Sequence, residues 1–240
     1  MDMHPRVLTC FWGLKVKGLI HAGAHKGEEA SVYSALGFGA VTWIEAIPKL
    51  AQELAQVIQP PSTVINAALW SRPNEKMTFN VTSAQGSSSL FDLGEVKDEY
   101  PTIVVIEQIE VVTETLDQLN DMASEKNLLV LDLQGAEYEA LLGATETLKG
   151  IQYLITEVNR RELYKGIKLV ADLDKLLSES NFIRVATRWT RHGWGEALYV
   201  RFPDSASNRL RKIWLHLRIY IYWCWLHFVE IPLVYLRRKK

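Results

Sequence analysis

Asp132 has the clearest capacity for chemistry in this sequence of 240 residues. It follows the apolar run 128–131, which is typical of a buried strand, and Gly135 precedes a helical segment that begins at residue 136. Ligands of open α/β sheets bind just outside the carboxyl ends of the strands. A carboxylate at that place is therefore a candidate for binding or catalysis. The alternative is that Asp132 only caps the helix that follows it.

A second candidate site is the turn after residues 14–22, a segment that also reads as a strand. Gly23 and Gly27 lie between that strand and a helix, so backbone N–H groups and the helix dipole would face a ligand. A dinucleotide fingerprint has a glycine at the position of His25, and a bulky residue there disfavours close approach to a pyrophosphate. The alternative is that the two glycines serve only the turn.

Glu45 lies 22 residues beyond Gly23, where the next predicted strand closes. A carboxylate at that position can accept hydrogen bonds from both hydroxyls of a ribose. Taken alone, Glu45 could equally be a surface acid. Taken together with the turn, it favours a nucleoside without a pyrophosphate, and S-adenosylmethionine is the common cofactor of that kind.

The elements that would position these residues alternate between strands and helices with short connections. This alternation predicts an α/β fold with a doubly wound, mostly parallel sheet. Two strands near the end, joined by a loop over 188–196, predict an antiparallel edge hairpin. The predicted strands are 14–22, 40–46, 62–69, 76–82, 103–112, 128–132, 151–158, 182–187 and 197–202, and the predicted helices are 28–36, 49–57, 115–123, 136–148 and 167–180.

Several short motifs resemble those of the FkbM-type methyltransferases, in the same order and spacing across roughly residues 15–202. They are residues 21–29, 43–48, 66–69, 87–90, 115–117, 131–137 and 193–199. The resemblance implies a class I methyltransferase (Rossmann-like) fold, S-adenosylmethionine as cofactor, and methyl transfer to a hydroxyl of a small molecule or glycan. The candidate cofactor-binding residues are then His21, Gly23, Ala24, His25, Gly27, Glu45, Asn66, Ala67 and Asp132.

Two groups of polar residues within these motifs have more than one interpretation. Many methyltransferases have Asp or Glu at the position of His21, where it helps to hold the methionine end of the cofactor. His21 either takes that role or is a strand-end histidine bonded to the backbone. Ser87, Ser88 and Ser89 either line an acceptor pocket or form a flexible loop.

Methyl transfer to a hydroxyl requires in-line alignment, which can supply about 7–11 kcal/mol, and removal of the hydroxyl proton. The candidate catalytic residues are Asp132, Glu157 and His192. Histidine titrates near neutrality, as a general base should, although His192 could instead be a solvated loop residue. Asp132, Glu157 and Asn159 are similar to the magnesium ligands of catechol O-methyltransferase, but Glu replaces Asp, so Mg²⁺ is the less favoured alternative and we assign no metal ligands.

Charge is divided unevenly along the chain, although the formal net charge is only −1. Residues 208–240 carry eight cations against Glu230 alone, a net +7, so the remaining residues carry −8. We therefore predict a methyltransferase domain over 1–207 and a separate apolar, basic helix over 208–240. Cys10 and Cys224 cannot form a disulfide framework, and residues 7–14 do not resemble a signal peptide, so we expect a cytoplasmic location.

The predicted C-terminal helix is rich in aromatic residues. Seven of the 24 aromatic residues lie within 213–236, yet the uninterrupted apolar run 219–226 is too short to span a bilayer. Because Trp and Tyr favour the headgroup boundary and Lys and Arg attract anionic lipid, we expect a peripheral helix at the cytoplasmic membrane face. The alternative is that this surface packs on the globule or on a second copy, which would give a homo-oligomer.

The leading hypothesis is therefore an S-adenosylmethionine-dependent O-methyltransferase with a small-molecule or glycan acceptor and no nucleic-acid partner. Two alternatives stay open. One is a non-catalytic, membrane-tethered nucleoside-binding module. The other is a nicotinamide-dependent oxidoreductase, which His25 and the antiparallel edge disfavour.

Overall fold

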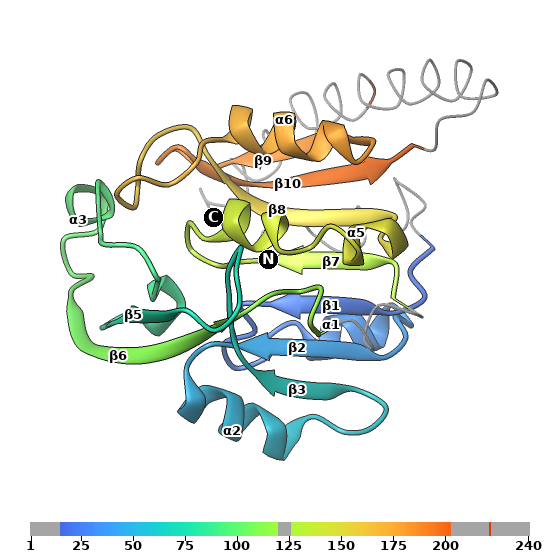
Figure 1. The fold of residues 1–240 in the computed structure, drawn as a ribbon, viewed down its shortest axis with the longest axis horizontal. Coiled ribbons are helices and arrows are strands. Elements are labelled where there is room, and N and C mark those ends of the chain that lie inside the picture. The colour runs from blue at the N-terminus through green and yellow to red at the C-terminus, as the bar shows by residue number, and fades with distance from the viewer. Residues whose placement is uncertain (1–14, 120–125, 203–220, 222–240) are drawn as a thin grey trace, which may run out of the picture.

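A seven-stranded sheet forms the centre of the computed structural model, which describes residues 15–119, 126–202 and 221 (Figure 1). The strand order is β3-β2-β1-β7-β8-β10-β9. Neighbours from β3 to β8 pair in parallel, and β10 is antiparallel to both β8 and β9. The predicted doubly wound sheet with an antiparallel edge hairpin is confirmed. Its strands are β1 (Leu19–Ala22), β2 (Val41–Glu45), β3 (Thr63–Asn66), β7 (Leu128–Leu131), β8 (Tyr153–Asn159), β9 (Phe182–Trp189) and β10 (Trp194–Arg201).

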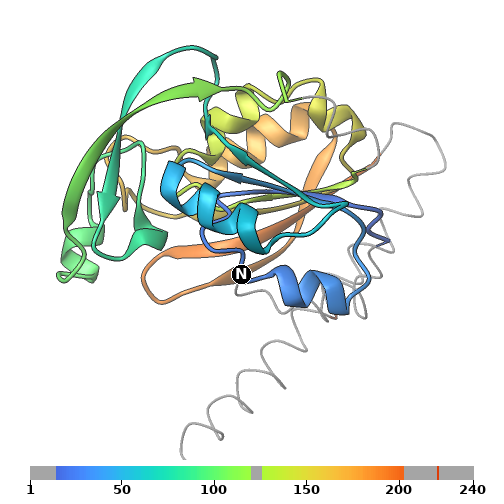
Figure 2. The same ribbon diagram turned by 90° about the horizontal axis from the view of Figure 1, so that it is seen from below.

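Helices cover both faces of this sheet, which Figure 2 shows nearly edge-on. Successive side chains of a strand point to opposite faces, so each strand contributes to two cores. In β1, Leu19 packs in the core with residues of α1 and α2, and Ile20 packs in the core with residues of α4, α5 and α6. The helices are α1 (Ala30–Ala35), α2 (Pro48–Val57), α4 (Glu137–Leu142), α5 (Thr147–Gly150) and α6 (Val170–Glu179).

A smaller three-stranded sheet, in the order β4-β6-β5, stands beside the carboxyl end of the main sheet (Figures 1 and 2). Phe79, Val81 and Val111 of this sheet pack against Ile47 and Leu50 at the start of α2. The segment therefore adds a wall next to the place where β1, β2 and β7 end. It contains β4 (Ala68–Leu69), β5 (Lys76–Thr82), the 3₁₀ turn η2 (Gln85–Ser87), α3 (Val96–Glu99) and β6 (Val105–Glu114).

Two predicted elements are divided in the structure. The strand predicted over 62–69 breaks at Ala67, whose N–H donates to Glu45 O at 3.0 Å, and the chain then leaves the main sheet to start the small one. The helix predicted over 136–148 ends before Gly143. A Cβ at Gly143 would lie 2.5 Å from Trp70 O, so the chain is too close to its neighbour there to carry a side chain.

Two other predictions of local structure were wrong. The loop predicted over 188–196 is a short turn over 190–193, because β9 extends to Trp189 and β10 starts at Trp194. The helix predicted over 115–123 is a turn as far as residue 119, and residues 120–125 lie outside the described part. In that turn Asp117 accepts hydrogen bonds from the N–H groups of Glu146 and Thr147, which anchors the start of α5.

None of the helices that the structure describes is both long enough and apolar enough to cross a membrane. The helix predicted over 208–240 lies outside the described residues, apart from Ile221.

Candidate functional site

The turn after β1 is shaped by three residues with positive φ: Gly23 at 82°, His25 at 46° and Gly27 at 71°. The N–H groups of Gly23 and Ala24 donate to Ile44 O of β2 at 2.9 and 3.0 Å. A Cβ at Gly23 would lie only 1.8 Å from Asp132 O at the end of β7. A glycine at position 23 therefore allows the turn and the end of β7 to approach each other closely.

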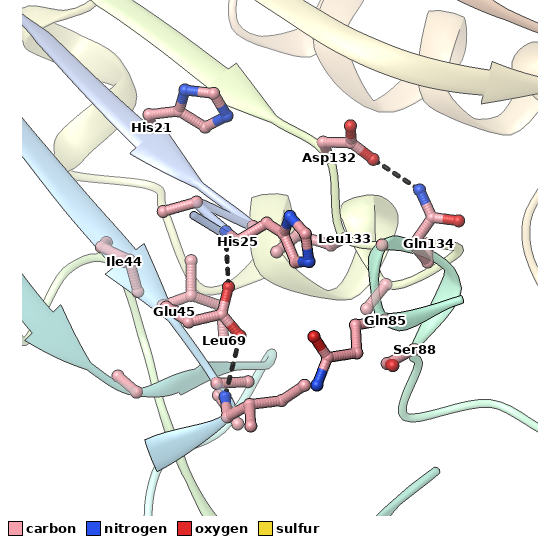
Figure 3. A pocket seen from close by; sticks show the side chains of 18 of the residues that line it. His21, His25, Ile44, Glu45, Leu69, Gln85, Ser88, Asp132, Leu133 and Gln134 are labelled. Atoms are coloured by element: carbon pink, nitrogen blue, oxygen red, sulfur yellow. Dashed lines mark hydrogen bonds between the residues drawn. The ribbon is translucent and has the colours of Figure 1, made fainter. Parts of the chain in front are cut away.

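A cavity of about 370 Å³ opens beside this turn, at the carboxyl ends of β1, β2 and β7 (Figure 3). This volume lies within the roughly 300–1,000 Å³ typical of small-molecule sites. We call it the turn cavity. Seven of the nine predicted cofactor-binding residues line it: His21, Gly23, Ala24, His25, Glu45, Ala67 and Asp132. The lining residues that sequence analysis did not identify include four apolar ones, Ile47, Leu69, Phe79 and Leu90.

Glu45 lines the turn cavity and links two backbone segments beside it. Its Oε2 accepts from His25 N at 2.7 Å and its Oε1 accepts from Ile47 N at 2.8 Å, and Figure 3 shows the carboxylate between these two segments. Burial raises the pKa of Glu45, and the N–H groups of Ile47, His25 and Ala46 oppose that shift. An ionised carboxylate has about four acceptor positions, so Glu45 retains capacity for two further donors such as the hydroxyls of a ribose.

Gly27 and Asn66, the other two predicted cofactor-binding residues, do not line the turn cavity. The Gly27 N–H closes the turn by donating to Ala24 O at 2.8 Å. The Asn66 side-chain amide donates to the carbonyl oxygens of Glu45 and Ala46 at 2.8 and 3.1 Å. Both residues therefore support the backbone that carries Glu45 and the turn.

The two histidines of the turn differ in their surroundings. His21 is 3% exposed, stacks on Trp43 at 5.1 Å between ring centroids, and shares a hydrogen bond with the hydroxyl of Tyr33. Burial lowers the pKa of His21 to about 4, so it is neutral at pH 7. His25 Nδ1 pairs with Glu28, whereas His25 Nε2 is buried without a hydrogen-bond partner among the described atoms. That nitrogen is available to a ligand in the turn cavity.

Three carboxylates gather where β7 and β8 end. Asp132 and Glu157 both accept from the side-chain amide of Gln134, at 2.6 and 3.1 Å, and Glu157 also accepts from Asn159 Nδ2 at 3.1 Å. Burial raises the pKa of Glu157 well above its ordinary value, and the charges of Glu137 and Asp132 raise it further. Burial likewise raises the pKa of Glu137 to about 7.

This arrangement does not fit the magnesium alternative. An N–H donor, the Gln134 amide, stands between Asp132 and Glu157, where a cation would have to lie. In the part of the chain that the structure describes, no group of three or more His, Cys, Asp and Glu side chains could hold a metal ion.

A second cavity, of about 300 Å³, is also lined by Asp132 and Gln134, and we call it the aromatic cavity. Glu157 lines it together with the rings of Tyr100, Tyr164 and Trp194. A smaller space of about 100 Å³ also lies against Asp132 and Glu157, with His21, Glu29 and Glu196 among its lining residues. Asp132 thus lines all three cavities, and its side chain is exposed to their space.

The three serines of residues 87–89 have separate positions. Ser87 lines the aromatic cavity and Ser88 lines the turn cavity. Ser89 is fully buried, and its Oγ donates to Gln134 O at 2.7 Å. Ser87 and Ser88 thus each line a cavity, whereas Ser89 supports the chain at Gln134.

His192 lines none of these three cavities. Its Nδ1 shares a hydrogen bond with Glu99 of α3, and its Nε2 accepts from Arg191 at 2.8 Å. Its carbonyl oxygen accepts from Arg161. His192 therefore ties the β9–β10 turn to α3, and the structure does not bring it together with Asp132 and Glu157.

Sequence analysis missed Gln134, Tyr164, Tyr100 and Trp194. Gln134 and Trp194 are within quoted motifs, where their polar or aromatic character was a usable signal. Tyr100 and Tyr164 lie in connections outside the predicted strands and helices, and nothing in the local sequence distinguishes them from ordinary core tyrosines.

Comparison with known proteins adds independent findings. The sequence model of the FkbM methyltransferase domain matches residues 21–184. A curated relative, the 2-O-methyltransferase NoeI of Sinorhizobium fredii, is 32% identical over 118 residues, which are 44% of this chain and 47% of that protein. The match thus spans about half the length of the relative.

Solved structures with a similar fold include two bacterial methyltransferases. Magnesium protoporphyrin IX methyltransferase (ChlM) from Synechocystis PCC 6803, with bound SAM, is 15% identical with a TM-score of 0.43, over 81% of this chain and 74% of that one. A SAM-dependent methyltransferase from Anabaena variabilis is 9% identical with a TM-score of 0.46, over 81% and 82% of the two chains.

Proposed function

Because this chain belongs to the FkbM methyltransferase family, we propose that it is an S-adenosylmethionine-dependent O-methyltransferase whose acceptor is a hydroxyl of a small molecule or glycan. The observation that supports this most is the turn cavity. There the backbone turn after β1, the buried acceptor Glu45 and the carboxylate Asp132 converge on a space of suitable size. The relative NoeI, a 2-O-methyltransferase, supports oxygen as the methylated atom.

The residues of the turn cavity suit each part of that cofactor. Glu45 would accept from the ribose hydroxyls, and the apolar side with Phe79 and Leu69 would contact the adenine ring. His25 Nε2 and Asp132 would bind the polar methionine end, where a carboxylate also favours the positive charge of a sulfonium. The bound cofactor would supply an electrophilic methyl group at the side of the cavity next to Gln134.

The aromatic cavity is the place for the acceptor, since it shares Asp132 and Gln134 with the turn cavity. Glu157 lines it and would take the hydroxyl proton as the acceptor oxygen attacks the methyl group, whose bonding electrons stay with sulfur. No Lys or Arg is present among the described residues that line these cavities. The acceptor is therefore uncharged or cationic, because an anion would be repelled by Asp132 and Glu157.

Calorimetry on the full chain with S-adenosylmethionine tests the cofactor assignment. Loss of charge-assisted hydrogen bonds costs about 1.5–3 kcal/mol, so Glu45→Ala should raise Kd by roughly ten- to hundredfold. Glu53→Ala is the matched control, because Glu53 is an exposed acid of α2 away from the cavity, and its Kd should equal that of the wild type. NAD should not bind detectably. An unchanged Kd in Glu45→Ala would contradict the assignment.

We also propose that residues 208–240 attach the enzyme to the cytoplasmic face of a membrane. Their net charge of +7 and their aromatic content support this, since both features favour an anionic lipid surface.

A further inference from the structure

The three residues Leu133, Gln134 and Gly135 supply N–H donors to all three carboxylates at the ends of β7 and β8. The backbone N–H groups of Leu133 and Gly135 donate to Glu137 Oε1 and Oε2 at 2.7 and 3.0 Å. The Gln134 side-chain amide serves Asp132 and Glu157. This short segment therefore stabilises negative charge on all three carboxylates.

The backbone of Gln134 is held in an uncommon conformation. Its φ is 52°, in the left-handed region that non-glycine residues rarely adopt. The hydrogen bonds to Glu137 fix the residues on both sides, and the bond from Ser89 Oγ fixes the Gln134 carbonyl. Strained backbone of this kind persists only where the surroundings over-determine it.

Tyr164 selects the orientation of the Gln134 side chain. The buried Tyr164 hydroxyl donates to Gln134 Oε1 at 2.7 Å. Burial raises the pKa of Tyr164 well above its ordinary value, so the hydroxyl stays protonated and remains a donor. With Oε1 engaged in this way, Nε2 faces Asp132 and Glu157. The reversed amide would direct an oxygen at two carboxylates and leave Tyr164 without this acceptor.

The other groups around Glu157 oppose its ionisation. Asp132 at the end of β7 and Glu137 on α4 are acidic, and Glu196 of β10 is its cross-strand partner. His21, which is neutral at pH 7, and Glu29 line the small space beside it. Against these stand two amide donors, Gln134 and Asn159. Asn159 belongs to the same strand as Glu157, so the orientation of the Gln134 amide is the contribution to Glu157 ionisation that a second segment controls.

We infer that Gln134 and Tyr164 are positioning residues, which favour the ionised form of Glu157, the form that can accept a proton beside the aromatic cavity, and which also hold Asp132 at the turn cavity. The role of Glu157 in methyl transfer rests on the proposed function. The dependence of its ionisation on Tyr164 and Gln134 does not.

The test is a pH titration of the full-length protein labelled with carbon-13 at the glutamate carboxyl groups, followed by NMR without cofactor or acceptor. Glu157→Gln identifies the Glu157 resonance. Tyr164→Phe removes only the hydroxyl, which orients the amide and also lies 3.2 Å from Ser87 O. Gln134→Asn keeps an amide but shortens its reach, and Asn tolerates the left-handed conformation well. Tyr153→Phe is the matched control, since Tyr153 lies at the opposite end of β8 in the other core.

The midpoint of the Glu157 titration should rise by about one pH unit in Tyr164→Phe and in Gln134→Asn, because each change withdraws a donor from the charged form. It should stay at the wild-type value in Tyr153→Phe. A wild-type midpoint in either Tyr164→Phe or Gln134→Asn overturns the inference. Calorimetry with S-adenosylmethionine tests the proposed function separately. Failure of the inference on Glu157 can therefore be distinguished from failure of the proposed function.

Discussion

At the scale of single residues, His21 shows how a polar side chain becomes part of a core. Its imidazole stacks on Trp43 and meets the Tyr33 hydroxyl, whereas its neighbour His25 faces the turn cavity with a free nitrogen. The two histidines are four positions apart in one motif and differ only in their environments. His21 packs against aromatic rings, whereas His25 has a nitrogen that can bind a ligand.

The buried imidazole of His21 makes stability depend on pH. Its pKa is about 4 when folded and 6.5 in the reference state, so between these values the unfolded chain binds a proton that the folded chain does not. The free energy of unfolding should therefore decrease as pH falls from 6.5 to 4, by up to about 3 kcal/mol from this residue. Urea denaturation across this pH range should show a smaller decrease of the unfolding free energy in His21→Gln than in the wild type. An equal dependence of the unfolding free energy on pH in the two proteins would contradict the burial argument.

Sequence analysis located individual acids better than it located their partners. Glu45 and Asp132 end buried strands, and a carboxylate in that position has few places to go except the ligand edge of the sheet. The contacts of Glu157 with Gln134 and of Gln134 with Tyr164 join residues 23 and 30 positions apart. Such pairings depend on how the connections fold back, which local patterns do not encode. For the same reason, local sequence could not show that His192 lies away from the cavities.

At the scale of elements, the approach of the first turn to β7 controls the shape of the cofactor site. Gly23→Ala would place a methyl group against the Asp132 carbonyl, and its φ of 82° is also unfavourable for alanine. We expect a loss of several kcal/mol in unfolding free energy and weaker binding of S-adenosylmethionine, measured by urea denaturation and calorimetry.

Gly37→Ala is the control for Gly23→Ala. Gly37 also has a positive φ, 67°, but nothing lies within 4 Å of the added methyl group. Gly37→Ala should lower the unfolding free energy only by the penalty for a positive φ, roughly 1–2 kcal/mol, and leave the affinity for the cofactor unchanged. Equal losses in the two variants would show that the contact with Asp132 does not matter.

Hydrophobic periodicity located most strands of the main sheet but not the points where elements are interrupted. The break at Ala67 depends on a partner strand, β6, that begins almost 40 residues later, and the break at Gly143 depends on close approach to Trp70. The loop predicted over 188–196 is longer than the observed turn over 190–193. The reason is that β9 and β10 stay paired through residues whose apolar and polar side chains do not alternate strictly. Tertiary pairing decided each of these boundaries.

At the scale of the whole molecule, the uneven charge predicts how the protein partitions between water and lipid. We expect the full chain to sediment with anionic vesicles and much less with neutral ones, because basic residues near a surface contribute about 1 kcal/mol each. A chain ending at residue 207 should stay in the supernatant while its Kd for S-adenosylmethionine is unchanged. Equal sedimentation of the two chains with anionic vesicles would contradict the membrane proposal.

The chain leaves the main sheet to form the small sheet and returns from it at the same place, where β4 pairs with β6. Ala68 and Leu69 pair with Thr113 and Glu114, so the two ends of the excursion over residues 70–112 lie side by side before the chain continues. An excursion closed at its base can change in length or content at little cost to the body that carries it. Exchange of residues 76–112 between relatives is thus a route to new acceptor preferences, provided the donor segment keeps the packing on α2 and the contacts of Ser89 with Gln134 and of Glu99 with His192.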